Sequence, residues 1–468
     1  MKQFIVIVCL LIVYSGYSQT ATDSIRVNEL SLNEYLGYVK LYHPVARQAL
    51  LKVNMAQAEL LKSRGAFDPK IEVDYDRKEF KGSEYYDILN GSFKIPTWFG
   101  IELKAGFEQN EGIFLNPERT VPDDGLYSAG ISVPLGQGLF INKRMATLRQ
   151  AKVFRNLSEA ERDLQLNQIL TDAALAYFDW FNAYNQVLLY ENFLANASIR
   201  FEGIKKRAIQ GDIAAIDSLE AGITVNNRKL SLEQAKVKLM KTGLELSNFL
   251  WLDGNIPLEL QPDVVPEQDL LLSIDETLRI NNELALDFRL EDHPKIKALS
   301  FKIEALEIDK RYKANKLLPR IDVNYNFLTS DAGNINTINT GDYKGGLYFN
   351  FPLFLRKERG ALRMAKIKIR DAQFDYDLES LRLTNKISAG YQELQSLETQ
   401  IQLIEKITTD YGVLLRAEER KFSFGESSVF LINSRERSLL TARLKQIELL
   451  TKVFNSKASL FRTLATQL

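Results

Sequence analysis

The sequence has 468 residues, with 60 Lys and Arg against 60 Asp and Glu, so its formal net charge is zero. This balance excludes the basic surface stripe that nucleic-acid binding requires. The length is too great for one ordinary hydrophobic core, and two or three structural units are therefore expected.

The first eighteen residues have the pattern of a secretory signal peptide. One Lys precedes an apolar run from Phe4 to Val13, and Gly16 and Ser18 are the small residues before a cleavage site that follows Ser18. The run is too short to span a bilayer, which leaves a short buried helix as the alternative. The only cysteine, Cys9, lies inside this segment, so we expect a mature chain without a disulfide or a Cys-based metal site.

The only two histidines are each followed by proline and lie 250 residues apart, at 43 and 293. Residues 43–75 align with residues 293–325 without a gap. The identical pairs are His43/His293, Pro44/Pro294, Lys52/Lys302, Pro69/Pro319, Ile71/Ile321, Val73/Val323 and Tyr75/Tyr325. This self-similarity predicts a chain that consists of two copies of one structural unit, residues 19–252 and 293–468.

Each His-Pro pair predicts the start of a helix. Proline is favoured at the first helical position, and the residue before it takes a non-helical conformation. We therefore expect structural helix starts at His43-Pro44 and His293-Pro294, with about two dozen residues of helix before the next proline. The alternative is a metal or proton-switch pair, which the absence of a second His, Cys or tight carboxylate cluster in each copy disfavours.

Beyond each of these helices the apolar residues alternate with polar ones, as in β-strands. Such runs occur within residues 70–135 and 320–353, and each has one apolar and one polar face. Strands of this kind are typical of a transmembrane β-barrel and equally of a half-buried soluble sheet. The first copy is longer here, because 65 residues separate Pro69 from Pro134 while 33 separate Pro319 from Pro352. The extra segment, "EYYDILNGSFKIPTW", is either an added strand or an extracellular loop.

Two long tracts without proline follow the strands, at residues 135–256 and 353–468. Apolar residues recur in them at steps of three and four, which indicates helices with coiled-coil packing. Gly211 and Gly425 are the turn candidates that divide the tracts into hairpins over residues 143–252 and 360–466. A helix over residues 144–210 would be about 100 Å long at ~1.5 Å per residue.

These parts together predict an oligomer. No segment after the signal peptide has the length of uninterrupted apolar sequence that a transmembrane helix needs, so any membrane spanning would be done by strands. Four to six strands are too few to close a barrel, and open sheet edges are not tolerated in lipid. Several chains must then pool their strands, with the helices forming a matching ring, which is an α+β architecture.

The chain resembles the TolC-type outer-membrane efflux proteins over nearly all of its mature length. The resemblance is carried by the duplicated "HP" (commonly Asn-Pro in the family), the Pro-Lys/Arg-Ile-x-Val-x-Tyr start of each strand region, "GISVPL" and "YFNFPL" before the long helices, and the tip sequence "GDIAAIDSLEA". It implies a homotrimer in the outer membrane of a Gram-negative bacterium, with a twelve-stranded barrel to which each chain gives about four strands. A periplasmic α-helical barrel would continue from it, with an equatorial belt from residues around 25–42 and the Pro-rich connection 253–292.

The resemblance also implies the function and the site. Such proteins are passive exit ducts of tripartite efflux or type I secretion systems, and their partners are a periplasmic adaptor and an inner-membrane transporter. The family narrows its periplasmic entrance with acidic residues at the hairpin tips, which correspond here to Asp217 with Glu220 nearby. In the second copy the matching positions are Leu431 and Ser434, so the acidic constriction is expected to depend mainly on Asp217.

The sequence contains no nucleotide-binding, metalloprotease or nucleophile-elbow motif. We therefore expect neither enzymatic activity nor a catalytic residue, and neither a cofactor nor a metal. The alternative function from another class is an exported coiled-coil adhesion or scaffold protein with a soluble β-head.

Overall fold

The computed structural model describes residues 28–280, 288–334 and 340–466. The expected signal peptide, residues 1–18, lies outside the described residues. The chain divides into two compact units that each combine distant segments. Unit 1 comprises Met1–Val39, Ala173–Thr277 and Gln400–Phe454, and unit 2 comprises Lys40–Asp172, Leu278–Thr399 and Asn455–Leu468.

Two helices of unit 2 begin at the His-Pro pairs, namely α3 (Pro44–Arg64) and α8 (Pro294–Asn315). In both, the histidine is the N-cap residue with an extended backbone, and proline occupies the first turn. Nδ1 of His43 accepts a hydrogen bond from the Val45 amide at 3.2 Å, and Nδ1 of His293 accepts one from the Lys295 amide at 3.1 Å. The imidazole thus satisfies a free amide of the first turn, as Asn or Ser does in other helices.

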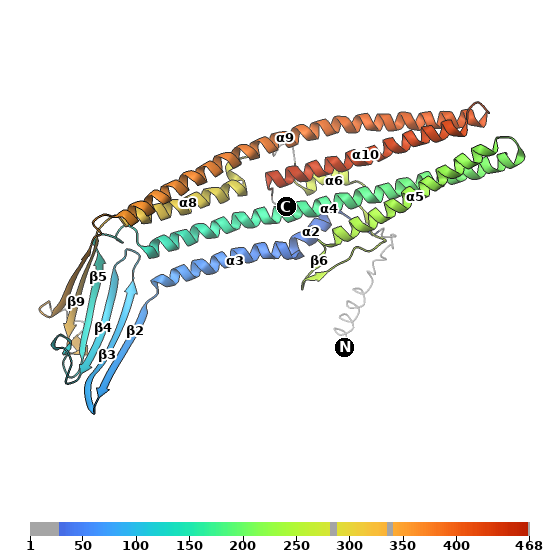
Figure 1. Cartoon of the computed structure of the whole chain (residues 1–468). Helices are drawn as coiled ribbons and strands as arrows, with labels where there is room; N and C mark the ends of the chain where they lie inside the picture. The colour runs from blue at the N-terminus through green and yellow to red at the C-terminus, as the bar shows by residue number, and fades with distance from the viewer. Residues whose placement is uncertain (1–27, 281–287, 335–339, 467–468) are drawn as a thin grey trace, which may run out of the picture. The chain divides into compact units, whose positions relative to one another are not determined.

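A single antiparallel sheet of six strands forms the β region of unit 2, in the order β10-β9-β5-β4-β3-β2 (Figure 1). The strands are β2 (Lys70–Phe80), β3 (Ser83–Pro96), β4 (Glu102–Glu111), β5 (Leu126–Pro134), β9 (Arg320–Thr329) and β10 (Tyr343–Asn350). The expectation of about four strands per chain is therefore wrong. The inserted segment of the first copy is the added strand β3, and the first copy contributes four strands while the second contributes two.

Apolar and polar residues alternate poorly along β3, so the sequence does not predict this strand clearly. Ile88, on the otherwise polar side of β3, is buried, while Tyr85 and Tyr86 are adjacent aromatic residues. The turn before it carries a clearer signal. Lys81 and Gly82 have φ angles of 54° and 72°, and two consecutive positive φ values are typical of the type I′ turn that joins hairpin strands.

Four long helices follow the strands: α4 (Lys143–Gln210), α5 (Ala215–Ser247), α9 (Arg356–Ser423) and α10 (Val429–Leu464). Helices α4 and α9 have 68 residues each. The first hairpin is shorter than expected at its end, because α5 stops at Ser247 and the short pair β6 (Trp251–Leu252) and β7 (Ile256–Pro257) follows. None of the described helices is both long and apolar enough to cross a membrane.

Unit 1 has an aromatic core between the helices. The ring of Phe454 packs at 5.4 Å from Phe178 and at 5.5 Å from Phe181, measured between centroids. The hydroxyl of the buried Tyr177 donates to the Leu30 carbonyl at 2.6 Å and accepts from the Glu267 amide at 3.1 Å. Burial raises the pKa of this phenol, which therefore stays protonated and keeps both bonds.

The two segments for which the resemblance implies a belt are joined within unit 1. Strand β1 (Glu29–Leu30) pairs in parallel with β8 (Val265–Pro266). Two short helices flank this pair in the sequence, α2 (Leu32–Tyr42) and α6 (Leu270–Thr277). Residues 281–287 of the second segment lie outside the described residues.

Candidate functional site

The sheet separates its side chains into an apolar and a polar face. Directly opposed residues of an antiparallel pair point to the same side, so the register assigns each residue to a face. The apolar face carries Ile71, Val73 and Tyr75 of β2, Leu89, Phe93 and Ile95 of β3, Leu103, Ala105 and Phe107 of β4, Tyr127, Ala129, Ile131 and Val133 of β5, Ile321, Val323, Tyr325 and Phe327 of β9, and Tyr343, Leu347 and Phe349 of β10. The opposite face carries mostly acidic, basic, amide, serine and glycine residues on the alternate positions. Its apolar and aromatic exceptions include Tyr86, Ile88, Leu126, Leu328 and Tyr348.

The apolar face runs diagonally across the strands. On β2 it is centred on Val73, which is level in register with Thr329 of β9. On β9 the apolar residues are centred on Asn324, which pairs with Gly346 of β10. Asn324 lies five residues from Thr329 along β9, in the direction of the helices. A drift of five residues at ~3.3 Å each, across five strand spacings of ~4.8 Å, corresponds to strands tilted by about 35° to the apolar band. This value matches the roughly 35–45° tilt of strands in transmembrane barrels.

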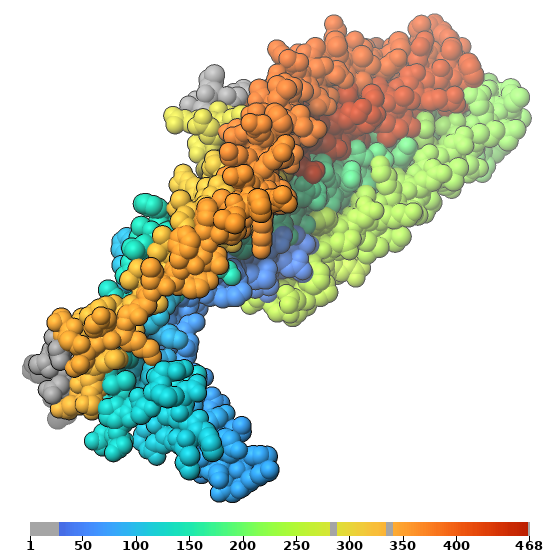
Figure 2. Space-filling model, turned by 60° about the vertical axis from the view of Figure 1, so that its left-hand side comes forward, coloured from blue at the N-terminus to red at the C-terminus, as the bar shows by residue number. Residues whose placement is uncertain are grey.

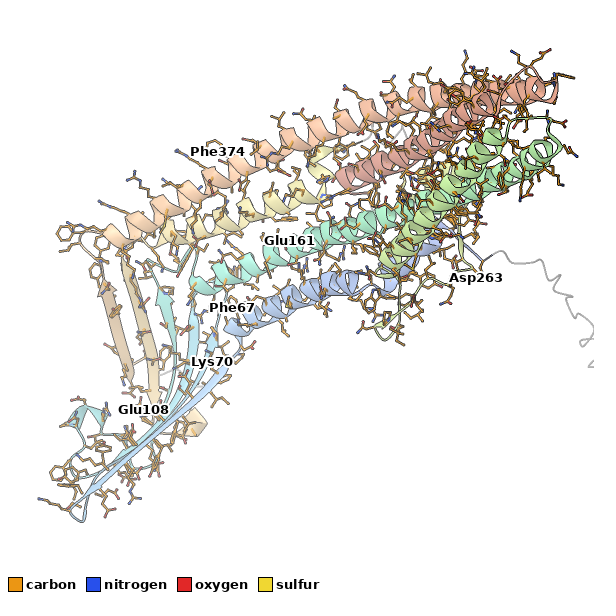
Figure 3. The ribbon with its side chains drawn as sticks, turned by 45° about the vertical axis from the view of Figure 1, so that its right-hand side comes forward. Phe67, Lys70, Glu108, Glu161, Asp263 and Phe374 are labelled. Carbon is orange, nitrogen blue, oxygen red and sulfur yellow. The ribbon has the colours of Figure 1, made fainter. Side chains whose placement is uncertain are left out.

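Ion pairs cover much of the polar face. Lys94 pairs with Glu72, Arg144 with Glu102 at 2.7 Å and Arg320 with Asp322 at 2.7 Å. Figure 3 labels Lys70 at the helical end of β2 and Glu108 toward the other end of the sheet, both on this polar face. Charged side chains of this kind bind water, as they do on the inner walls of transmembrane β-barrels.

The two hairpin tips in unit 1 have the same turn. Gly211 and Gly425 have φ angles of 81° and 80°. At each tip the glycine amide bonds to the carbonyl three residues earlier, and the next amide bonds to the carbonyl five residues earlier, with lengths of 3.0 to 3.2 Å. This is the Schellman motif, which needs a left-handed residue and therefore favours glycine.

A small apolar cluster joins the tips of the two hairpins. Ile204, Ala221 and Val429 are buried together, and Phe422 packs against them. The Arg207 guanidinium lies 5.3 Å above the Phe422 ring. The hairpins therefore contact each other near their turns rather than ending separately.

The predicted entrance residues lie in the first turns of α5. Asp217 is half-buried near the helix N-terminus, where its negative charge is favoured by the helix dipole. Glu220 turns toward the second hairpin, since its Oε1 accepts a hydrogen bond from the Asn433 side chain at 3.1 Å. Leu431 and Ser434 of α10 are exposed. Glu220 thus has a hydrogen-bond partner within the chain. The second hairpin has no acidic residue at the two matching positions, 431 and 434.

A buried charge network in unit 1 was not anticipated from the sequence. The Glu436 side chain is 1 % exposed and pairs with Arg200, while Arg228 Nε lies 3.9 Å from its other oxygen. Arg200 also contacts Glu419 at 3.1 Å. These four residues come from α4, α5, α9 and α10, so the network links both hairpins.

Three side chains of this network are largely shielded from water, with Glu436, Arg228 and Arg200 exposed by 1%, 11% and 15%. Burial lowers the pKa of Arg228, and the nearby Glu436 carboxylate counteracts the shift. No motif marks these residues, because charged side chains recur along all four helices and their burial depends on packing. Among the described residues, no group of three or more His, Cys, Asp or Glu side chains is placed to hold a metal ion.

Comparison with known proteins identifies the fold, and one family model matches part of the chain. The family model described as outer membrane efflux protein matches residues 286–466. No curated protein matches the sequence significantly. The resemblance drawn from the sequence motifs is confirmed over the matched segment.

Solved outer-membrane proteins share the fold along almost the whole chain. The outer membrane protein VceC from Vibrio cholerae is 15% identical with a TM-score of 0.64, covering 93% of this chain and 96% of its own. The Campylobacter jejuni CmeC outer membrane channel is 14% identical with a TM-score of 0.63, covering 93% and 85%. CusC, whose structures concern transmembrane channel formation, is 15% identical with a TM-score of 0.65, covering 96% and 95%. Residues 286–466 are therefore similar to the outer membrane efflux protein family, and the chain as a whole shares the fold of these solved outer-membrane proteins.

Proposed function

We propose that this chain forms the outer-membrane exit duct of an efflux or secretion system and moves solutes outward without catalysis. The observation that carries the proposal is the six-stranded sheet, whose apolar face follows a diagonal band at the tilt of membrane-spanning strands. Its opposite face is polar, as the wall of a water-filled passage must be. A soluble β-head would bury its apolar face on its own core, whereas Ile71 and Leu347 are 78% and 72% exposed.

We expect the duct to be a homotrimer in the outer membrane, with the helices extending into the periplasm. The family resemblance supports three copies. An exposed apolar stripe on α9 supports contact with a neighbouring copy, since it has helical spacing and no cover within the described chain. It consists of Met364, Ile367, Phe374, Leu378 and Leu381. Figure 3 labels Phe374 on this helix.

We further propose that a periplasmic adaptor docks at the hairpin tips and connects the duct to an inner-membrane transporter. The tips carry exposed apolar side chains, which marks a protein-interaction surface. Ile209 and Ile216 of the first hairpin are 78% and 71% exposed, and Phe424 and Phe430 of the second are 74% and 65% exposed.

Membrane fractionation tests the function against the adhesion or scaffold alternative. A duct stays in the outer membrane through a high-salt wash and needs detergent for release, because its apolar face contacts lipid. The purified protein should also produce ion-conducting steps in a planar bilayer. A mature chain that is soluble without detergent would overturn the proposal and favour the scaffold function.

The proposed entrance constriction depends on Asp217. Copies of this carboxylate related by symmetry would gather at the narrow end and attract cations. We predict that Asp217→Ala lowers cation selectivity and alters single-channel conductance in a planar bilayer. Ser434→Ala, an exposed polar residue at the position that matches Glu220 in the second copy, is the control and should leave both unchanged. Equal behaviour of the two variants would show that Asp217 has no part in the constriction.

A further inference from the structure

We propose that the sheet closes between copies through a specific pairing of β10 with β2 of the next chain, in which Leu347 lies opposite Val73 and Lys344 opposite Asp76. The inference deepens the proposed function, since it assumes that several copies form one wall. It also replaces the twelve-stranded barrel by one to which each chain gives six strands. A trimer would then have about eighteen strands, a number at which barrels enclose an aqueous channel.

Both edges of the sheet are open and suited to pairing. Every residue of β2 and of β10 is exposed, and in Figure 2 the blue β2 edge is uncovered on the face shown. Neither strand contains proline, and the one irregularity of β2 lies near its end, between Lys78 and Glu79. The charged side chains of β2 lie mainly on its polar face, so they do not block pairing along the edge. Unpaired amides at these edges would be costly in lipid.

The strand directions favour a second copy as the occupant. All five neighbouring pairs are antiparallel, so β2 and β10, as the first and sixth strands of the sheet, run in opposite directions. The β2 strand of an identical chain can therefore join β10 in the same antiparallel pattern. Each chain then contributes one β2 edge and one β10 edge, and a ring of chains pairs every edge with a neighbour.

The register follows from the diagonal drift of the apolar face. The drift averages about one residue per strand, and one further step sets Leu347 opposite Val73 of the next copy, with Phe349 opposite Ile71. A slip by one residue would place acidic side chains of β2 on the lipid side. The even spacing of apolar residues thus leaves only slips of two as competitors.

Charge disfavours one of these registers, and the drift of the apolar face disfavours the other, in which Lys344 would lie opposite Asp74. In the proposed register Lys344 is opposite Asp76, while a slip of two in one direction places it opposite Lys78. Within the described chain Lys344 reaches only Glu108, at 3.8 Å, and Asp74 and Asp76 have no ion-pair partner. Opposite charges across a strand pair are stabilising and like charges are destabilising. Tyr343 is also placed opposite Arg77, where ring and guanidinium can stack.

Disulfide cross-linking tests both the pairing and its register. Asp76→Cys combined with Lys344→Cys should yield disulfide-linked oligomers up to trimer on a non-reducing gel after mild oxidation of outer membranes. The link cannot form within one chain, because five strand spacings of ~4.8 Å separate the edges, whereas disulfide Cα atoms lie within ~7 Å. The matched control, Asp74→Cys with Lys344→Cys, tests the slip of two and should give at least ten-fold less linked product.

The outcomes separate this inference from the proposed function. Linked oligomers with the first pair and few with the second support the pairing. Stronger linking through Cys at position 74, or monomers in both cases, overturns it. The reduced double variant is also tested for conductance in a planar bilayer. Conducting channels without linkage would contradict only the pairing, and linkage without conductance would contradict only the duct.

Discussion

At the scale of single residues, we expect stability to be most sensitive to polar side chains that become buried when the chain folds. Glu436 is almost fully buried and faces Arg200 and Arg228 from other helices. Buried ion pairs contribute little net stability compared with apolar packing, but a buried charge that loses its partner is costly. The packing of the four helices in unit 1 therefore depends on keeping the buried charges of this network paired.

We predict that Glu436→Ala lowers the free energy of unfolding by about 3–5 kcal/mol, because Arg228 remains buried without its carboxylate and Arg200 keeps only the half-exposed Glu419. Urea unfolding of the detergent-solubilised protein, followed by circular dichroism, measures the change. Glu419→Ala is the control, since this carboxylate is 43% exposed and pairs at that exposure contribute only about 0–1 kcal/mol. Equal losses in the two variants would contradict the importance of burial.

His293 adds a pH dependence to stability. Its pKa is lowered from the ordinary value of 6.5, mainly because burial disfavours the charged ring. The neutral ring accepts from the Lys295 amide and can donate to the Thr463 carbonyl at 3.0 Å. The unfolded chain gains its proton first on acidification, so the contribution of His293 is complete above pH 6.5 and decreases as the pH falls through the lowered folded value.

We therefore predict that the thermal midpoint falls between pH 6.5 and pH 5, about where histidine titrates. The fall should be smaller in His293→Asn, which keeps a capping acceptor but has no titrating ring. Melting curves at several pH values provide the measurement. An identical acid dependence in the variant would rule out His293 as the source.

At the scale of elements, local chemistry determines where each helix and turn begins. The His-Pro pairs start α3 and α8, and the glycines at 211 and 425 end α4 and α9 through left-handed turns. Both features depend on neighbours in the chain, which explains why the sequence alone was sufficient to predict them. For β3 the sequence does not distinguish a strand from a loop, because its residues do not alternate well, and its pairing with β2 and β4 shows that it is a strand.

We predict that Gly211→Ala destabilises the protein by roughly 1–2 kcal/mol, the penalty of a left-handed conformation for a residue with Cβ. No atom lies within 4 Å of the added methyl group, so the effect isolates the backbone. Gly203→Ala is a matched control inside α4 with equally open space, and it should be stabilising by up to about 1 kcal/mol. Urea unfolding would disprove the turn requirement if both changes were stabilising.

At the scale of the whole molecule, the described chain leaves apolar surfaces and strand edges uncovered. Its sheet has two open edges, and its helix α9 presents an apolar stripe to solvent. A monomer with these surfaces would aggregate or associate. The same surfaces become walls and interfaces once copies assemble, and this is why we place the function in an oligomer.

We predict that Phe374→Glu weakens assembly, because this 71% exposed ring lies in the middle of the stripe. Size-exclusion chromatography with light scattering in detergent should show dissociated chains at protein concentrations where the unchanged protein is trimeric. Phe374→Leu keeps the surface apolar and should remain trimeric. Dissociation of both variants, or of neither, would show that the stripe is not an interface.

The sequence by itself determined the repeated unit, the helix starts, the hairpin turns and the alternation of the strands, because each follows from chemistry within a few residues or from direct comparison of two segments. It also predicted the tip positions of Asp217 and Glu220, whose roles stay predictions. Only the tertiary structure decided that six strands share one sheet, that their apolar face is diagonal, and that Glu436 is buried between arginines. These features depend on register and burial, which arise when segments hundreds of residues apart come into contact.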